Sequence, residues 1–265
     1  MGYRGRIAPT PTGYLHLGHA RTFWIAQQRC HDAGGILLYR NEDLDTDRCK
    51  PEYREAALED CLWLGLQWEG TPIDQSPRTE HYLEAFKELR DKGFLFPCTC
   101  TRKDILEAPS APHNEDGETI YPGTCRTRQN GLGESKINWR FRVPHGEKVE
   151  FTDAHYGPQT FISGEDFGDF PVWQKNGIPS YQLAVVVDDA AMKITEVVRG
   201  ADLLTSTARQ LLLYRALNLT PPSFYHCELM LDEAGKRLAK RNDALSLRSL
   251  RNRGKTPEEL RSEWA

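Results

Sequence analysis

The sequence lacks any apolar run near the ~20 residues that a membrane-spanning helix needs, and no apolar signal-peptide core follows its first residues. Both absences predict a cytoplasmic protein without a membrane partner. A strong charge of either sign is also lacking, because 34 basic residues stand against 38 acidic ones. This balance argues against indiscriminate binding to nucleic acid, although a local basic face can still bind one RNA.

The number of cysteines is odd, seven, which argues against a disulfide framework in a reducing compartment. Four are scattered through apolar patterns and are expected to be small buried residues: Cys30, Cys49, Cys61 and Cys227. The other three, Cys98, Cys100 and Cys125, lie in a loop-rich stretch with little periodicity. That stretch has too little apolar content to fold unaided, so a metal ion held by thiolates is a reasonable way to stabilise it.

Helical patterns alternate with strand patterns, and internal repeats are absent, which predicts an α/β fold throughout. Strands are expected at short apolar or alternating runs: 6–8, 36–40, 138–143 and 147–153, the last two paired with each other. Helices are expected where apolar residues recur at helical spacing: 17–33, 51–62, 80–92 and 207–217. Two β-branched runs, 183–187 and 194–198, are expected to be buried, and Thr256 opens a helix-start signature.

A length of 265 residues fits one large catalytic domain with a smaller insertion. We predict the first half of a nucleotide-binding domain at 1–93 and its second half at 136–265. The insertion, at 94–135, coincides with the stretch that carries the three clustered cysteines.

The residues His16-Leu17-Gly18-His19 stand where the loop after the first expected strand meets the first expected helix. A helix start offers free backbone N–H groups and a positive dipole, which suit phosphate. Glycine permits close approach of a nucleotide, and two histidines one turn apart can donate to phosphate oxygens. Taken alone, the four residues are as readily two surface histidines at a helix start.

The surrounding sequence favours the nucleotide site. Residues 6–13, Arg-Ile-Ala-Pro-Thr-Pro-Thr-Gly, resemble the loop before the HIGH-type motif of glutamyl-tRNA synthetases, class I enzymes with a Rossmann-type catalytic domain. Further stretches match that family in the expected order: 41–45, 181–189, 198–203 and the basic loop 237–241. The resemblance covers nearly the whole chain, so the chain is identified as similar to this family.

The resemblance implies activation of L-glutamate with ATP. The implied glutamate contacts are Arg6, Ala8, Thr10, Glu42, Tyr181 and Arg199. Charge agrees with this independently, because two carboxylates and one amine need two cations and one anion, and arginine binds carboxylates through two parallel hydrogen bonds. The alternative is that Arg6 and Glu42 form a structural ion pair. Their expected places at carboxyl ends of strands, where open α/β sheets bind ligands, favour the functional interpretation.

The implied ATP contacts are Pro9, His16, Gly18, His19, Leu238 and Lys240, with His16, His19 and Lys240 as catalytic residues. Loop 237–241 resembles a KMSKS-type loop, which supplies a lysine to the triphosphate as pyrophosphate leaves; Ala239 replaces the usual serine. Mg²⁺ is expected with ATP, although the sequence shows no dedicated acidic cage for it.

The zinc module of the same family holds one structural Zn²⁺ with three cysteines and a tyrosine. The resemblance therefore implies Cys98, Cys100, Tyr121 and Cys125 as ligands. On general ligand chemistry His113 competes for the fourth position, and the resemblance favours Tyr121.

Only 24 residues follow Arg241 in this chain of 265, whereas ordinary members continue into an anticodon-binding domain. This pattern resembles a short branch without that domain, which activates glutamate without tRNA and transfers it to the queuosine base in the anticodon of tRNA(Asp). A monomer is expected. The alternatives are a catalytic fragment that charges the 3′ end of tRNA(Glu), a small nucleotidyltransferase, and a non-catalytic RNA-binding module.

Overall fold

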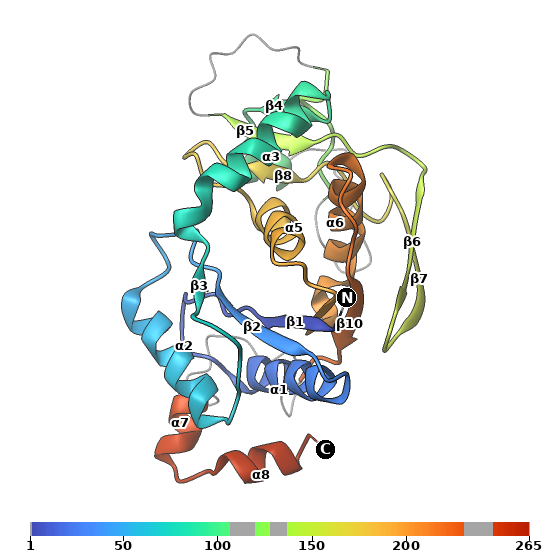
Figure 1. The fold of residues 1–265 in the computed structure, drawn as a ribbon. Coiled ribbons are helices and arrows are strands. Elements are labelled where there is room, and N and C mark those ends of the chain that lie inside the picture. The colour runs from blue at the N-terminus through green and yellow to red at the C-terminus, as the bar shows by residue number, and fades with distance from the viewer. Residues whose placement is uncertain (1, 107–119, 128–136, 231–245, 265) are drawn as a thin grey trace.

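A computed structural model describes residues 2–106, 120–127, 137–230 and 246–264 (Figure 1). Within these ranges, none of the helices combines the length and the apolar character that a membrane span needs. The described chain folds as layers of helices around a mostly parallel sheet, which confirms the expected α/β class.

The central sheet consists of two groups of strands that meet side by side. The first group has the order β1-β2-β3, all parallel: Arg4–Ile7, Ile36–Asn41 and Ile73–Asp74. The second has the order β7-β6-β10-β9: Gly157–Ile162, Lys148–Asp153, Ser223–Cys227 and Glu196–Gly200. Thr195 N–H donates to the Arg4 carbonyl at 2.9 Å and joins β9 to β1. Strand order therefore reverses between β1 and β9, where doubly wound sheets bind ligands.

Helices cover both faces of this sheet (Figure 1). α1 (Leu17–Asp32) packs Phe23 and Ala26 against Ile7 and Leu37 on one face. On the other face lie α5 (Tyr181–Ala191) and α6 (Leu204–Ala216), together with the short 3₁₀ turn η2 (Ala201–Leu203). Further helices are α2 (Pro51–Trp63), η1 (Ser76–Arg78), α3 (Thr79–Asp91), α7 (Leu247–Asn252) and α8 (Pro257–Ser262). The expected helices are confirmed, including α8, which Thr256 caps by accepting from Glu259 N–H.

A second, antiparallel sheet has the order β4-β5-β8: Leu95–Cys98, Asn138–Phe141 and Pro171–Trp173. The short helix α4 (Arg102–Leu106) follows β4 along the chain. The expectation that β5 pairs with β6 is wrong, because β6 pairs with β7 and β10. The reason is local: Asp153 accepts from the N–H groups of His155 and Tyr156, and Gly157 has φ +72°, so a tight turn closes β6 onto β7.

The β-branched run 183–187 is buried as expected, but it is helical and forms part of α5. Burial on nearly all sides removes the alternation that separates a strand from a helix in the sequence. The second run lies mainly in β9 and is also buried. Of the four scattered cysteines, Cys30, Cys61 and Cys227 are buried, whereas Cys49 is half-buried beside the backbone of Glu42.

Candidate active site

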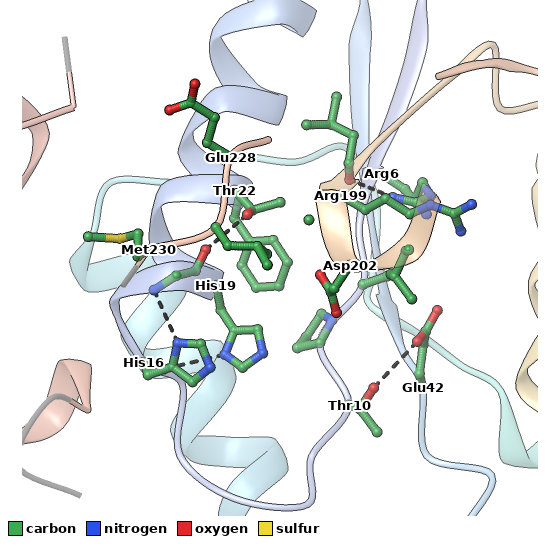
Figure 2. A pocket seen from close by; sticks show the side chains of 18 of the residues that line it. Arg6, Thr10, His16, His19, Thr22, Glu42, Arg199, Asp202, Glu228 and Met230 are labelled. Carbon is green, nitrogen blue, oxygen red and sulfur yellow. Dashed lines mark hydrogen bonds between the residues drawn. The ribbon is translucent and has the colours of Figure 1, made fainter. Parts of the chain in front are cut away.

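A cavity of about 320 Å³ opens at the carboxyl ends of β1, β2 and β9, beside the start of α1 (Figure 2). Ten residues expected to bind substrates line it: Arg6, Ala8, Pro9, Thr10, His16, Gly18, His19, Glu42, Tyr181 and Arg199. Leu238 and Lys240 lie outside the described residues. The cavity has two chemically different ends, with the histidines at one and the arginines at the other.

The histidine end is organised by the start of α1. His16 caps this helix: its Nδ1 accepts from Gly18 N–H at 3.1 Å, and its own N–H donates to His19 Nδ1 at 3.4 Å. Because Nδ1 of each ring accepts, a neutral ring carries its proton on Nε2. A side chain at Gly18 would come within 3.0 Å of the His16 ring, so glycine keeps this arrangement open. Two Nε2–H donors beside a helix N-terminus suit a polyphosphate.

The arginine end contains a buried ionic chain. Arg6 Nε donates to Asp189 Oδ1 at 3.3 Å, and the same oxygen accepts from Arg40 Nη1 at 2.6 Å. Arg40 Nη2 donates in turn to Glu42 at 3.1 Å, and Thr10 donates to the other Glu42 oxygen at 3.4 Å. Arg6 and Glu42 therefore have separate partners and do not form the structural ion pair considered as the alternative.

Charge compensation keeps this chain ionised. Burial alone would raise the pKa of Asp189, but the guanidinium groups of Arg40 and Arg6 outweigh it and hold the pKa below its usual value. Burial would lower the pKa of Arg40, yet Asp189 and Glu42 raise it on balance. Asp189 is therefore held as a carboxylate and Arg40 as a cation behind the pocket.

Arg199 is held differently. Its Nε donates to His226 Nε2 at 3.2 Å, its Nη1 to the Tyr181 hydroxyl at 3.4 Å and its Nη2 to Thr207 Oγ1 at 2.7 Å. The Tyr181 acceptor is a neutral phenol at neutral pH, as an ordinary tyrosine is. All three nitrogens of this guanidinium are therefore held by uncharged acceptors, and its positive charge remains available to an anion in the cavity.

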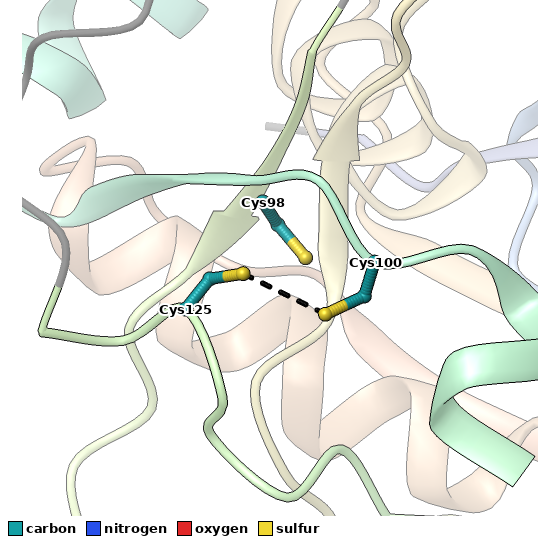
Figure 3. Close-up of side chains that lie close together, drawn as sticks. All are labelled: Cys98, Cys100 and Cys125. Carbon is teal, nitrogen blue, oxygen red and sulfur yellow. Dashed lines mark hydrogen bonds between the residues drawn. The ribbon is translucent and has the colours of Figure 1, made fainter. Parts of the chain in front are cut away.

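The three clustered cysteines converge at the end of β4 (Figure 3). The sulfurs of Cys98, Cys100 and Cys125 lie within 4.8 Å of one another, and those of Cys100 and Cys125 are 3.6 Å apart. The Tyr121 hydroxyl is 3.4 Å from Cys98 Sγ and 3.6 Å from Cys100 Sγ. A tetrahedral zinc ion spaces two sulfurs by about 3.8 Å and a sulfur and an oxygen by about 3.5 Å. The four side chains fit that geometry; His113 lies outside the described residues.

The family description "tRNA synthetases class I (E and Q), catalytic domain" matches residues 3–263. The chain belongs to that family. The expected fold, a Rossmann-type class I synthetase catalytic domain, is thereby confirmed.

Named relatives of this synthetase are similar over nearly all of it. A glutamyl-Q tRNA(Asp) synthetase of Symbiobacterium thermophilum is 46% identical, covering 96% of this chain and 83% of the relative. One of Nitratidesulfovibrio vulgaris is 45% identical, covering 95% and 82%. The crystal structure of a glutamate-tRNA synthetase from Elizabethkingia anophelis matches with a TM-score of 0.78 at 27% identity over 91% of this chain. The chain spans about half, 53%, of that longer protein.

Several pocket-supporting residues of this synthetase escaped the sequence analysis. Asp189 lies in a stretch that matches the family but carries no assigned role there, and Arg40 ends a run with the pattern of a buried strand. His226 and Thr207, which hold Arg199, carried no signal at all in the sequence. Asp189, Thr207 and His226 each contact a pocket arginine from another element, and Arg40 shares Asp189 with Arg6, so only the fold reveals them.

Proposed function

We propose that this class I synthetase activates L-glutamate with ATP and transfers it to the queuosine base in the anticodon of tRNA(Asp). The observation that carries the proposal is one cavity with the start of a helix and two histidines at one end and two buried arginines beside Glu42 at the other. The relatives at 45% and 46% identity, named glutamyl-Q tRNA(Asp) synthetases, support the choice of acceptor.

The two arginines of the pocket match glutamate better than glutamine, because glutamate has two carboxylates and glutamine has one. In this assignment Arg6 and Arg199 bind the carboxylates and Glu42 the ammonium group. Ala8, Thr10 and Tyr181 complete the contacts of the amino acid.

Activation needs no nucleophile from the protein. A carboxylate oxygen of glutamate attacks the α-phosphorus of ATP, and pyrophosphate leaves with the electrons of the broken P–O bond. The Nε2–H groups of His16 and His19 stabilise charge on the phosphates, with Pro9 and Gly18 beside the nucleotide. Leu238 and Lys240 are assigned to the same task on the sequence resemblance alone, and Mg²⁺ enters with ATP.

The second step transfers the glutamyl group to the nucleoside. A hydroxyl oxygen of queuosine attacks the activated carbonyl carbon and loses its proton to water, the carbonyl–phosphate bond breaks, and AMP leaves with the electrons of that bond. We assign activation to the protein without tRNA on the sequence resemblance alone.

Zinc completes the proposal. Cys98, Cys100, Cys125 and Tyr121 would hold one Zn²⁺ that stabilises an insertion at 94–135 between the two halves of the catalytic domain. Purified protein is expected to contain about one zinc per chain, and Cys125→Ala to lose it. Tyr121→Phe is expected to weaken zinc binding without abolishing it. Full zinc content in Tyr121→Phe would show that Tyr121 is not a ligand.

The direct test has two stages. Pyrophosphate exchange into ATP is measured with glutamate and with glutamine, and exchange is expected with glutamate alone. If neither amino acid supports exchange, the protein is better explained as the non-catalytic RNA-binding module. Labelled glutamate is then offered with tRNA from cells that contain or lack queuosine. Label that requires queuosine and remains on that nucleoside after digestion confirms the proposal.

One observation favours a second candidate. The fold is also that of a glutamate-tRNA synthetase, with a TM-score of 0.78 to the Elizabethkingia anophelis protein. Label on the 3′ adenosine of tRNA(Glu), regardless of queuosine, would therefore assign the chain to ordinary aminoacylation.

A further inference from the structure

A buried carboxylate and a buried imidazole lie in line behind Arg199. Asp153 ends β6 and His226 lies on the adjacent strand β10; Asp153 Oδ2 is 2.6 Å from His226 Nδ1. Both side chains are 0% exposed. The other ring nitrogen of His226, Nε2, is the one that meets the Arg199 guanidinium at 3.2 Å.

The state of the imidazole follows from its neighbours. Burial and the charge of Arg199 lower the pKa of His226 to about 4, even though Asp153 acts in the opposite direction. Burial alone would raise the pKa of Asp153, but the Tyr156 N–H and His226 outweigh it and hold it below its usual value. At neutral pH the ring is therefore uncharged beside a carboxylate, which can only accept. Nδ1 must carry the proton, and Nε2 is left as an acceptor.

Only this form of the ring can hold Arg199. A proton on Nε2 would place one N–H donor against another at 3.2 Å. The ring also has little freedom to turn, since the rings of Phe151 and Phe224 lie 6.5 Å and 6.3 Å from it between centroids. Asp153 thus sets the tautomer, and the tautomer sets the position of the guanidinium.

We propose that His226, oriented by Asp153, is a positioning residue that holds the Arg199 guanidinium in place for a carboxylate of the amino acid. The imidazole also acts as an uncharged spacer. A carboxylate in direct contact would neutralise Arg199, whereas Asp153 orients it from the far side of the ring. This inference deepens the proposed function and rests on it, because it takes glutamate as the ligand of Arg199.

Two amide variants test the contacts of the two ring nitrogens of His226 separately. The amide of His226→Gln reaches the position of Nε2 and can still accept from Arg199. The amide of His226→Asn reaches only the position of Nδ1, so it keeps the contact with Asp153 and loses Arg199. In pyrophosphate exchange with the full chain, H226N is expected to raise the KM for glutamate about 10-fold to 100-fold. H226Q is expected to raise it less than about 5-fold, and neither variant to change the KM for ATP.

Contrary outcomes are distinct. The positioning role would be overturned if both variants had the same KM for glutamate as the unchanged protein. It would also be overturned if a variant raised the KM for glutamate and the KM for ATP in parallel and lowered the Tm. Glutamate binding by calorimetry, run beside the exchange assay, separates the two proposals. Unchanged protein that binds glutamate without exchange contradicts activation alone, whereas unchanged protein that binds no glutamate contradicts both.

A spectroscopic measurement needs no variant and covers the case in which H226N does not fold. Two-bond ¹H–¹⁵N NMR of the histidine rings is expected to show one ring that stays neutral to about pH 5, with its proton on Nδ1. Assignment through H226Q identifies that ring. A charged ring, or a proton on Nε2, would overturn the inference.

Discussion

The β1 side and the β9 side of the pocket each present one buried arginine, and the two are held in opposite ways. Arg6 and Arg199 are equally buried, each 5% exposed. Arg6 donates to the carboxylate of Asp189, whereas the three nitrogens of the Arg199 guanidinium meet uncharged acceptors. The β1 side is therefore a closed ionic chain, and the β9 side is a cation that a ligand can neutralise.

Because the two arginines are held differently, we expect one side of the pocket to contribute mainly to stability and the other mainly to substrate binding. A buried charge that loses its partner is strongly destabilising, so the β1 side is expected to matter to the fold. A buried guanidinium held by uncharged acceptors gives little stability, but it can bind an anion strongly because water screens it poorly. The β9 side is therefore expected to matter mainly to the amino-acid substrate.

Asp189→Asn is expected to have the largest effect on stability. It removes the carboxylate shared by Arg6 and Arg40 while preserving size, and we expect the free energy of unfolding to fall by about 3–5 kcal/mol. Urea denaturation measures this. The matched control is Glu59→Gln, which breaks the exposed pair with Arg248 and is expected to cost less than about 1 kcal/mol. Equal losses would mean that the chain is not a closed ionic unit.

Acid pH tests the imidazole on the β9 side. The unfolded chain binds a proton at His226 near pH 6.5, while the folded protein binds it only near the pKa of about 4, so the free energy of unfolding falls as pH drops across that window. The expected loss is about 3 kcal/mol between pH 7 and pH 4.

Another buried group, Asp60, changes the free energy of unfolding with pH in the opposite direction, so its contribution must be cancelled. Burial raises the pKa of Asp60 to about 6, so this carboxyl favours folding as pH falls through the same window. The quantity to measure is therefore the difference between the unchanged protein and H226Q, since Asp60 is common to both. A difference that does not vary with pH would show that His226 is not kept neutral.

The sequence predicted the elements with local signals and failed where the signal is tertiary. α1 ends before glycines and α8 begins at a capping box, so both could be located. The alternation in β6 shows which face is buried but does not name the neighbouring strand, and β5 was chosen wrongly.

The same limit applies to the site. Charge and motif order indicated which residue types a glutamate pocket needs, and the ten described candidates do line one cavity. Their catalytic and binding roles remain predictions. The groups that support them could not be predicted, because Asp189 lies 183 residues from Arg6 and His226 lies 27 from Arg199. A buried partner of this kind is chosen by the packing of strands and helices, which no local pattern records.

Arg6→Met and Arg199→Met compare the two sides directly, since each replaces a guanidinium by an apolar group of similar length. Arg6→Met takes a partner from Asp189 and is expected to lower the free energy of unfolding by about 2 kcal/mol. Arg199→Met is expected to change it by less than about 1 kcal/mol, because Thr207 Oγ1, 3.1 Å from His226 Nε2, can donate to that nitrogen instead. Both variants should lose exchange with glutamate. A greater loss of stability in Arg199→Met would reverse the comparison.

Tyr181→Phe is expected to have the smallest effect and tests whether the β9 side acts mainly through position. The hydroxyl accepts from Arg199 Nη1 at 3.4 Å, a long hydrogen bond, and 37% of Tyr181 is exposed. Its loss leaves the contacts of Arg199 with His226 and Thr207 intact, so the glutamate KM should rise no more than about 5-fold. The Tm and the KM for ATP should not change. A rise as large as that of H226N would mean that Tyr181, rather than the imidazole, sets the place of Arg199.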